Sequence, residues 1–262
     1  MPMTDLSGRV AIVTGSGANI GEACARALAK AGATVILADI AAERAEAVAR
    51  SIQASGGQAQ GMALDLAQED SITALVADVM RQHQGIDILH NNAADTRLEQ
   101  MAADGSLLDL DAATWDRAFH VNARGTMLMI KAVAPHMIAG GGGSIINISS
   151  TNANRAWAMF SGYCSAKAGM TMFSKCVAQH FLETNANVRC NTVHPGPIET
   201  PNFKRLTAAE GAEQLLADWQ KNNPFTEIGS VEDIGEVVAF LASDAARYVN
   251  ASEFVAAGGT LL

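Results

Sequence analysis

In Arg9-Val10-Ala11-Ile12-Val13-Thr14-Gly15-Ser16-Gly17-Ala18-Asn19-Ile20-Gly21, a short apolar run leads directly into a glycine-rich turn. The run predicts a buried strand, and an alanine-rich helix is expected to follow the turn as far as about Gly32. A strand, a glycine turn and a helix in this order can place a pyrophosphate at the helix N-terminus, where free N–H groups and the helix dipole favour negative charge. We therefore expect a nucleotide-binding turn at residues 15–21.

An acidic residue follows the second predicted strand. Asp39 lies 18 residues beyond Gly21, which is about the spacing at which a carboxylate binds ribose hydroxyls in a dinucleotide fold. The same charge would repel a 2′-phosphate, and neither Ser16 nor Ile40 offers a positive charge, so NAD is favoured over NADP. The alternative is that Asp39 only caps the helix expected over Ala42 to Ala54.

Strand-like and helical segments alternate further along the chain. Strands are expected over Gln58 to Leu64, which runs into Asp65-Leu66, and over Ile86 to His90, which runs into Asn91 to Ala94. Such alternation predicts right-handed crossovers and a parallel α/β sheet. Because no Pro/Ser-rich linker, repeat or low-complexity tract divides the chain, we expect one domain over residues 1–262.

The composition is typical of a globular protein, with 49% hydrophobic and 17% charged residues. A net charge of −9 argues against a nucleic-acid or anionic-membrane surface. No signal sequence precedes the first strand, and Lys131 and Pro135 interrupt the apolar run around Met127 to Ile138, so a cytoplasmic protein is expected. The four cysteines and six histidines form no metal or disulfide pattern, so reduced thiols and no metal site are expected.

The middle of the chain contains a long polar connection, Asp95 to Thr114, which is either a surface excursion or part of a subunit contact. The helix expected over Ala112 to Ile138 carries Asn122, a poor helix former, which suggests that something local needs this amide. A strand over Ser144 to Ser149 presents Ser149-Ser150 at its carboxyl end, where open α/β sheets bind ligands.

A tyrosine and a lysine stand four residues apart in Tyr163-Cys164-Ser165-Ala166-Lys167. In a helix this spacing puts both side chains on one face. A nearby ammonium favours the phenolate and is expected to lower the pKa of Tyr163 from its ordinary value of about 10. Tyr163 is therefore a candidate general acid/base. The alternative is a buried tyrosine beside a solvated lysine.

Five motifs together resemble those of the short-chain dehydrogenase/reductase family, over almost the whole length from Gly8 to Gly259. The cofactor turn Thr-Gly-x-x-x-Gly-x-Gly of the family appears here with asparagine in place of the middle glycine, as Thr14, Gly15, Asn19 and Gly21. Asn tolerates the positive φ of such a turn better than other non-glycine residues. The Asn-Asn-Ala-Gly motif of the family appears as Asn91-Asn92-Ala93-Ala94.

The active-site residues of the family match four positions of this chain: Asn122, Ser150, Tyr163 and Lys167. The serine is identified by its place thirteen residues before the tyrosine. A further segment, Asn191 to Thr200, resembles the one that lines the nicotinamide. The resemblance implies a Rossmann fold, with a doubly wound parallel sheet of about seven strands in the order 3-2-1-4-5-6-7 and helices on both faces. It also implies a homotetramer.

The resemblance further implies a mechanism. Tyr163 exchanges a proton with the substrate oxygen, and Lys167 favours the phenolate and binds the nicotinamide ribose. Ser150 holds the substrate oxygen, and Asn122 is expected to hold a water that connects Lys167 to solvent. The predicted reaction is the NAD-dependent interconversion of a secondary alcohol with a hydrophobic body, such as a cyclic or aryl alcohol, and its ketone.

The cofactor is expected to lie along the glycine turn and the carboxyl ends of the strands. The predicted cofactor residues are Gly15, Gly17, Asn19, Ile20, Gly21, Asp39, Ile40, Asp65, Leu66, Asn92, Ala93, Tyr163, Lys167, Pro195, Gly196, Ile198 and Thr200. The predicted substrate residues are Ser150, Trp157, Tyr163 and Phe203, the last in a flap expected at about 201–224.

Two other functions fit parts of the pattern. One is an NADPH-dependent reductase of 3-oxoacyl groups on acyl carrier protein, which Asp39 disfavours. The other is a non-catalytic nucleotide-sensing protein, which would not need Ser150, Tyr163 and Lys167, yet all three are present.

Overall fold

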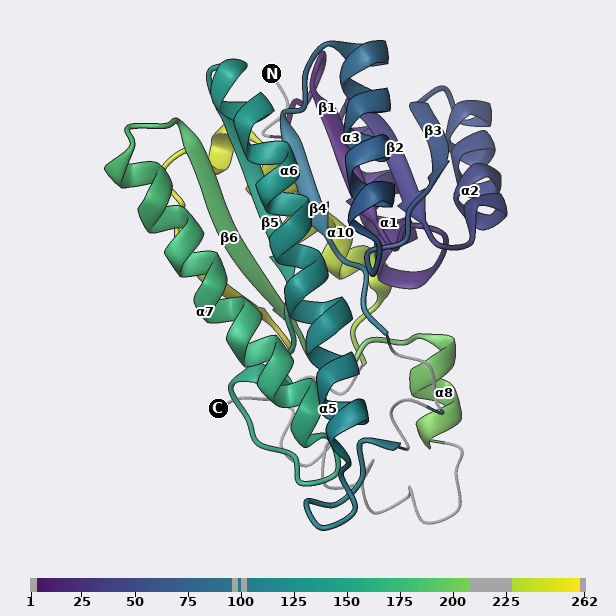
Figure 1. The fold of residues 1–262 in the computed structure, drawn as a ribbon. Coiled ribbons are helices and arrows are strands. Elements are labelled where there is room, and N and C mark those ends of the chain that lie inside the picture. Colours follow the sequence, from purple (N-terminus) through teal and green to yellow (C-terminus); the bar gives the residue numbers. More distant parts are fainter. Residues whose placement is uncertain (1–3, 96–98, 100–102, 208–227, 260–262) are drawn as a thin grey trace.

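The computed structural model describes residues 4–95, 99, 103–207 and 228–259 (Figure 1). At its centre lies a seven-stranded sheet in the order β3-β2-β1-β4-β5-β6-β7, and every neighbouring pair is parallel. The strands are β1 (Val10–Thr14), β2 (Thr34–Asp39), β3 (Gln58–Ala63), β4 (Ile88–Asn91), β5 (Gly143–Ile148), β6 (Val188–Pro195) and β7 (Glu253–Ala256). The predicted α/β class and strand order are confirmed.

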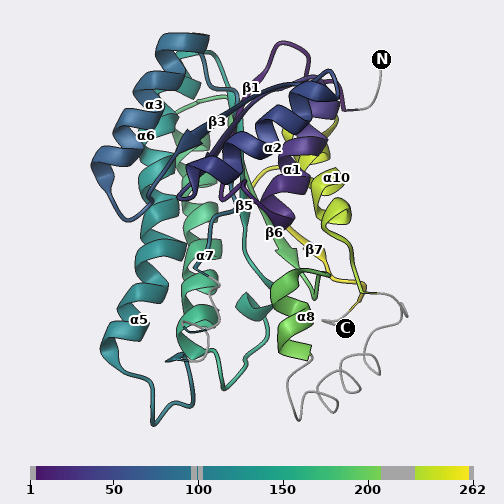
Figure 2. The same cartoon turned by 90° about the vertical axis from the view of Figure 1, so that its right-hand side faces the viewer.

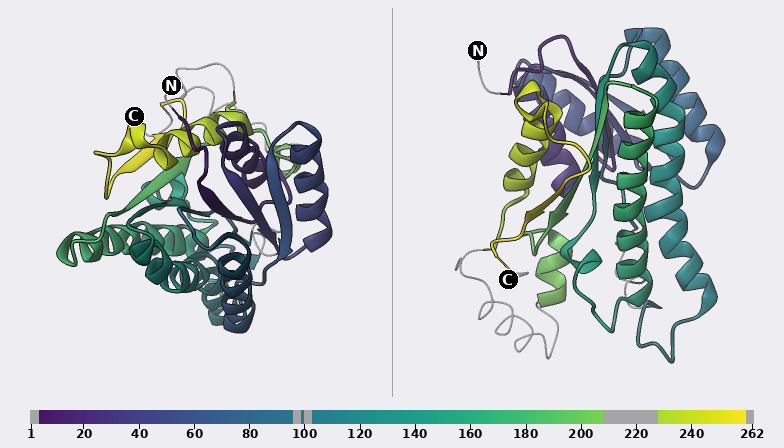
Figure 3. Two further views of the ribbon diagram at one scale, coloured as in Figure 1. Left: turned by 90° about the horizontal axis from the view of Figure 1, so that it is seen from above. Right: turned by 90° about the vertical axis from the view of Figure 1, so that its left-hand side faces the viewer.

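Helices cover both faces of the sheet, as the view along it shows (Figure 2). One face packs against α1 (Asn19–Lys30), α2 (Ala42–Ala54) and α10 (Val231–Ala242), and the other against α3 (Glu69–His83), α6 (Thr126–Ala139) and α7 (Ser161–Glu183). The view from above shows the same two layers (Figure 3). Among the described helices, none is both long and apolar enough to cross a membrane.

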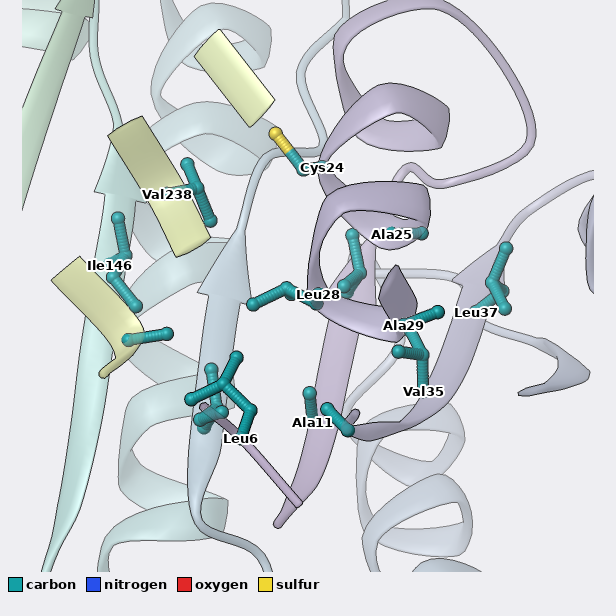
Figure 4. Packing of buried hydrophobic residues seen from close by; sticks show 14 of the residues in the cluster. Leu6, Ala11, Cys24, Ala25, Leu28, Ala29, Val35, Leu37, Ile146 and Val238 are labelled. Carbon is teal, nitrogen blue, oxygen red and sulfur yellow. The ribbon is translucent and has the colours of Figure 1, made fainter. Parts of the chain in front are cut away.

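Two apolar cores hold this frame together. In the first, Leu28 of α1 packs in one cluster with Val238 of α10 and Ile146 of β5 (Figure 4). The second cluster, on the opposite face, contains Ile12 of β1 and Phe181 of α7. Each fully buried side chain of this size stabilises the fold by about 1.5–3 kcal/mol. The packed strands therefore support the loops that follow their carboxyl ends.

The helix expected over Ala112 to Ile138 is one helical path in three parts. α5 (Ala112–Phe119) passes into a π-helical segment, η1 (His120–Gly125), and then into α6. The amide Nδ2 of Asn122 donates to the carbonyl of Ala118 at 2.9 Å, one turn back. Single π turns inside helices often occur at functional sites. Asn122, the poor helix former noted in the sequence, thus lies in a real irregularity of the helix.

Two predicted segments are described only in part. The first residues of the expected flap form α8 (Pro201–Thr207), which lies below the ends of β6 and β7 in Figure 2, whereas 208–224 lie outside the described residues. In the connection between β4 and α5, Leu107 and Leu108 are exposed on the surface.

Candidate active site

A cavity of about 830 Å³ follows the carboxyl ends of the strands, from the loop after β3 to the loop after β6. This size is typical of small-molecule and cofactor sites. Its position agrees with the general rule that open parallel sheets bind ligands beyond the carboxyl ends of their strands. All seventeen residues predicted to hold the cofactor line this cleft: Gly15, Gly17, Asn19, Ile20, Gly21, Asp39, Ile40, Asp65, Leu66, Asn92, Ala93, Tyr163, Lys167, Pro195, Gly196, Ile198 and Thr200.

The glycine turn forms a tight cradle at one end of the cleft. Gly15 has φ +63°, and a Cβ there would lie 2.7 Å from the Cα of Ala93. A Cβ on Gly21 would lie 2.1 Å from the carbonyl oxygen of Gly15. Asn19 has φ +54°, so the asparagine adopts the left-handed conformation expected of the glycine it replaces. The backbone of the glycine turn can therefore come close to a diphosphate that binds at the N-terminus of α1.

Hydrogen bonds from the residues after β4 hold the glycine turn in place. The amide Nδ2 of Asn92 donates to the carbonyls of Thr14 and Gly15, at 3.1 and 3.0 Å. The backbone N–H groups of Asn92 and Ala93 both donate to the hydroxyl of Thr14, at 3.1 Å each. Because these polar groups satisfy one another, the turn is held in shape by the neighbouring strand.

Asp39 connects the cradle to the start of α2. Its Oδ2 accepts a hydrogen bond from the N–H of Gly17, and its Oδ1 accepts one from the N–H of Ala41, both at 2.9 Å. Ala41 is the residue that precedes α2, and its own side chain makes no capping hydrogen bond. Asp39 is therefore not the N-cap of α2, and its oxygens retain lone pairs that can accept further hydrogen bonds from the cleft.

Arg44 lines the same end of the cleft, although the sequence did not single it out. A Cβ on Gly17 would lie 2.8 Å from the Cβ of Arg44, so the first turn of α2 sits against the glycine turn. Within the described part of the chain, the guanidinium of Arg44 forms no ion pair. A cation thus lies near Asp39, although neither Ser16 nor Ile40 provides one. The sequence signal for this cation is the position of Arg44, five residues after Asp39.

Three of the residues predicted to carry the chemistry meet at the other end of the cleft. Ser150, two residues after the end of β5, hydrogen-bonds to the phenol of Tyr163 and accepts from the N–H of Asn152 at 3.1 Å. Lys167 is 2% exposed, and its Nζ donates to the carbonyl of Ile148 at 2.8 Å. The same Nζ lies 5.8 Å from the ring centroid of Tyr163.

The charge states differ from the expectation based on the sequence. Burial raises the pKa of Tyr163 to about 12, although the hydrogen bond from Ser150 acts in the opposite direction. Burial also lowers the pKa of Lys167 to about 8. The prediction that Lys167 lowers the pKa of Tyr163 is therefore wrong for this structure. Desolvation disfavours both charged forms, and the amine is directed to the backbone of β5.

Asn122 lies behind the cleft, where its neighbour Val121 contributes to the lining. The side chain of Asn122 is 2% exposed. Its Oδ1 has no hydrogen-bond partner among the described residues, so this oxygen can accept from a donor inside the site.

The two aromatic residues predicted for the substrate pocket separate. Phe203 of α8 lines the cleft, whereas Trp157 does not. Trp157 packs edge-on against Phe160 at a centroid distance of 5.2 Å and remains 38% exposed. The prediction for Trp157 rested on its place between Ser150 and Tyr163, and the loop turns it away from them. Asp95, which the sequence did not suggest, lines the cleft instead.

The comparisons with known proteins agree with this geometry. A family model described as enoyl-(acyl carrier protein) reductase matches residues 15–260. The chain is also 37% identical over 259 residues to a probable short-chain type dehydrogenase/reductase of Bradyrhizobium diazoefficiens, covering 99% of this chain and 89% of that one. The chain belongs to the short-chain dehydrogenase/reductase family. It is therefore an oxidoreductase that acts on alcohols or ketones.

Two solved structures of this family have nearly the same fold. One is a 7α-hydroxysteroid dehydrogenase complexed with NADH and 7-oxo glycochenodeoxycholic acid, with a TM-score of 0.89, 31% identity, and coverage of 98% of this chain and 95% of that chain. The other is L-sorbose reductase from Gluconobacter frateurii complexed with NADPH and L-sorbose, with a TM-score of 0.89, 30% identity, and coverage of 100% and 99%. Members of the short-chain dehydrogenase/reductase family with this fold thus bind either nicotinamide cofactor.

Proposed function

We propose that this short-chain dehydrogenase/reductase interconverts a secondary alcohol and its ketone with NAD as cofactor. The observation that carries the proposal is the meeting of Ser150, Tyr163 and Lys167 at one end of a cleft whose other end holds a glycine cradle and Asp39. The cradle fits a dinucleotide because a Cβ at Gly15 or Gly21 would fill it. When bound, a nicotinamide cofactor supplies the acceptor or donor of the hydride.

The chain's own residues would manage the proton. In oxidation the Oη of Tyr163 takes the proton of the substrate hydroxyl, and in reduction it returns one. The hydroxyl of Ser150 hydrogen-bonds to Tyr163 and is available to hold the substrate oxygen. Lys167, with a pKa lowered to about 8, can keep or release a proton near neutral pH. The Oδ1 of Asn122 can accept a hydrogen bond behind this group.

The proposed substrate has a hydrophobic body, such as a cyclic or aryl alcohol. Phe203, Ile198 and Val121 along the cleft support this choice, and so does the ring ketone bound by the 7α-hydroxysteroid dehydrogenase. The test is a panel of cyclic and aryl secondary alcohols and open-chain polyols with NAD, followed by NADH absorbance. We expect the highest kcat/KM among the cyclic and aryl alcohols. Turnover confined to the polyols would reject the substrate class, and no turnover with any alcohol would reject the reaction.

A second candidate is the NADPH-dependent reduction of 3-oxoacyl groups on acyl carrier protein. It is supported by Arg44, which lines the cleft near Asp39, and by the description of the matching family model. A 3-oxoacyl thioester with NADPH therefore belongs in the same panel. Turnover of the thioester with NADPH that exceeds every alcohol with NAD would favour this second candidate.

Asp39→Ala is expected to narrow the preference for NAD over NADP by at least about tenfold, which corresponds to about 1.4 kcal/mol. The variant removes a charged acceptor for the ribose hydroxyls and the repulsion toward a 2′-phosphate, while Arg44 remains. The measurement is kcat/KM with each cofactor. The double variant Asp39→Ala/Arg44→Ala is the control, and it should lose the part of the NADP gain that Arg44 provides. If the preference for NAD over NADP were unchanged in Asp39→Ala, Asp39 would only connect Gly17 to Ala41 and would not select the cofactor.

We also propose that the chain is a single-domain protein that forms a homotetramer in the cytoplasm. The seven-stranded sheet, which contains strands from both the start and the end of the chain, supports the single domain. Exposed apolar side chains, Met172 and Leu182 on α7 and Val255 on β7, support burial against further subunits.

A further inference from the structure

The connection between β4 and α5 contains a buried carboxylate that contacts the first turn of α7. Asp104 is 3% exposed. Its Oδ1 accepts a hydrogen bond from the N–H of Gly162 at 2.8 Å, and its Oδ2 accepts one from the N–H of Tyr163 at 2.7 Å. The two N–H groups lie 58 and 59 residues further along the chain. Tyr163 is the residue to which the proton transfer is assigned above.

These hydrogen bonds replace the cap that α7 lacks. The helix begins at Ser161, and the preceding Phe160 offers no side-chain acceptor. The first N–H groups of a helix have no intrahelical partner, and a capping side chain normally accepts from the second and third residues. In α7 these residues are Gly162 and Tyr163. A carboxylate from a distant loop therefore performs the task of a local cap, and its negative charge meets the positive end of the helix dipole.

The contact leaves little space. A Cβ on Gly162 would lie 3.3 Å from both carboxylate oxygens of Asp104, which is tighter than ordinary van der Waals contact. A larger residue at this position would push the carboxylate away from the two N–H groups. One turn further along α7, Lys167 is tied to the carbonyl of Ile148. The first two turns of the helix are thus held from two sides, by the connection and by β5.

We propose that Asp104 is a positioning residue for the reaction, because it fixes the first turn of α7 and so holds the hydroxyl of Tyr163 against Ser150. This inference rests on the alcohol–ketone reaction proposed above. Asp104 lines neither the cofactor end nor the reacting end of the cleft, so its effect passes through the backbone of Gly162 and Tyr163. A displacement of about 1 Å at a reacting group can lower a rate by about 100-fold.

The experiment compares three variants. Asp104→Ala removes both hydrogen bonds, and Asp104→Asn keeps one acceptor and loses the charge. The matched control is Asp111→Ala, because Asp111 caps α5 from the same connection by accepting from the N–H of Thr114 at 2.7 Å. We expect kcat to fall by at least about tenfold in Asp104→Ala and by less in Asp104→Asn, with the KM for NAD unchanged within about twofold. Asp111→Ala should lower the Tm and keep the kcat.

Two further readings separate positioning from stability. The pH profile of kcat should move to lower pH in Asp104→Ala, because a looser first turn exposes the phenol of Tyr163 to water. A merely structural role would lower the Tm and leave both the kcat per folded molecule and the pH profile as in Asp111→Ala, and that result would overturn the proposal. If the alanine variant does not fold, Asp104→Asn serves for the same comparison.

Hydrogen exchange provides a reading that needs no substrate. The amides of Gly162 and Tyr163 should lose protection in Asp104→Ala and keep it in Asp111→Ala. Unchanged protection in Asp104→Ala would overturn the proposal, whatever the activity. If the wild-type protein oxidises no alcohol of the panel, the proposed function fails, while loss of protection would still show that Asp104 holds the turn that carries Tyr163.

Discussion

Tyr163→Phe is expected to lower kcat by about 10²–10⁴-fold, the usual contribution of a general acid/base, while NAD affinity stays within a few-fold of wild type. The variant removes only the hydroxyl, which hydrogen-bonds to Ser150, and keeps the ring. The cradle at Gly15 to Gly21 and the carboxylate of Asp39 lie at the other end of the cleft, so cofactor binding should persist. The measurement is kcat with the best alcohol of the panel, together with the Kd for NAD.

The chain offers a matched control for this variant. Tyr248 is the other of its two tyrosines, and it is fully exposed. Tyr248→Phe should leave kcat within about twofold of wild type, because exposed positions away from the cleft contribute little. Retention of more than about a tenth of the wild-type kcat in Tyr163→Phe would contradict the assignment of the proton transfer to this hydroxyl.

The parts of the site that depend on local sequence could be predicted. The glycine turn, Asp39 and the residues after β4 follow strands at characteristic spacings, and the parallel sheet brings the carboxyl ends of those strands together. Asn19 was expected to tolerate positive φ, and it does so at +54°. The sequence also indicated that something local needs Asn122, a poor helix former, and the structure has a π-helical segment at this position.

The parts that depend on tertiary contacts could not be predicted. Asp104 meets α7 only because a connection 58 residues earlier in the chain folds over the helix N-terminus. Arg44 reaches the cleft because α2 packs beside the glycine turn. Trp157 lies between Ser150 and Tyr163 in the sequence, yet its loop turns it onto Phe160. Spacing along the chain does not predict these tertiary contacts.

The charges of Tyr163 and Lys167 illustrate the same limit. Their offset of four residues places both on one face of α7, as expected, but the offset does not reveal how deeply each group is buried. Burial dominates, so the pKa of Tyr163 rises to about 12 and that of Lys167 falls to about 8. The site therefore contains a phenol that keeps its proton and an ammonium that is costly to bury.

Lys167→Met is expected to stabilise the cofactor-free protein at pH 7 while lowering kcat by at least about 10²-fold. The pKa of Lys167 is about 8 in the folded protein against an ordinary value of 10.5, so the buried charge costs about 3 kcal/mol at pH 7. Methionine loses the hydrogen bond to Ile148, which is worth about 1.5–3 kcal/mol because its donor is charged. A gain of up to about 1.5 kcal/mol in the free energy of unfolding should remain.

The pH dependence of this gain identifies its cause. Below pH 8 both the folded and the unfolded wild type hold the proton, so the full cost is present. Between pH 8 and 10.5 the unfolded chain binds more protons than the folded one, so wild-type stability rises with pH and the advantage of Lys167→Met is lost.

Urea unfolding at pH 7 and at pH 10.5 measures the stability difference at both limits. The exposed Lys131→Met on α6 is the control and should change stability by less than about 0.5 kcal/mol at either pH. If Lys167→Met were no more stable than wild type at pH 7, or kept its advantage at pH 10.5, the buried ammonium of Lys167 would not be what destabilises the wild-type protein.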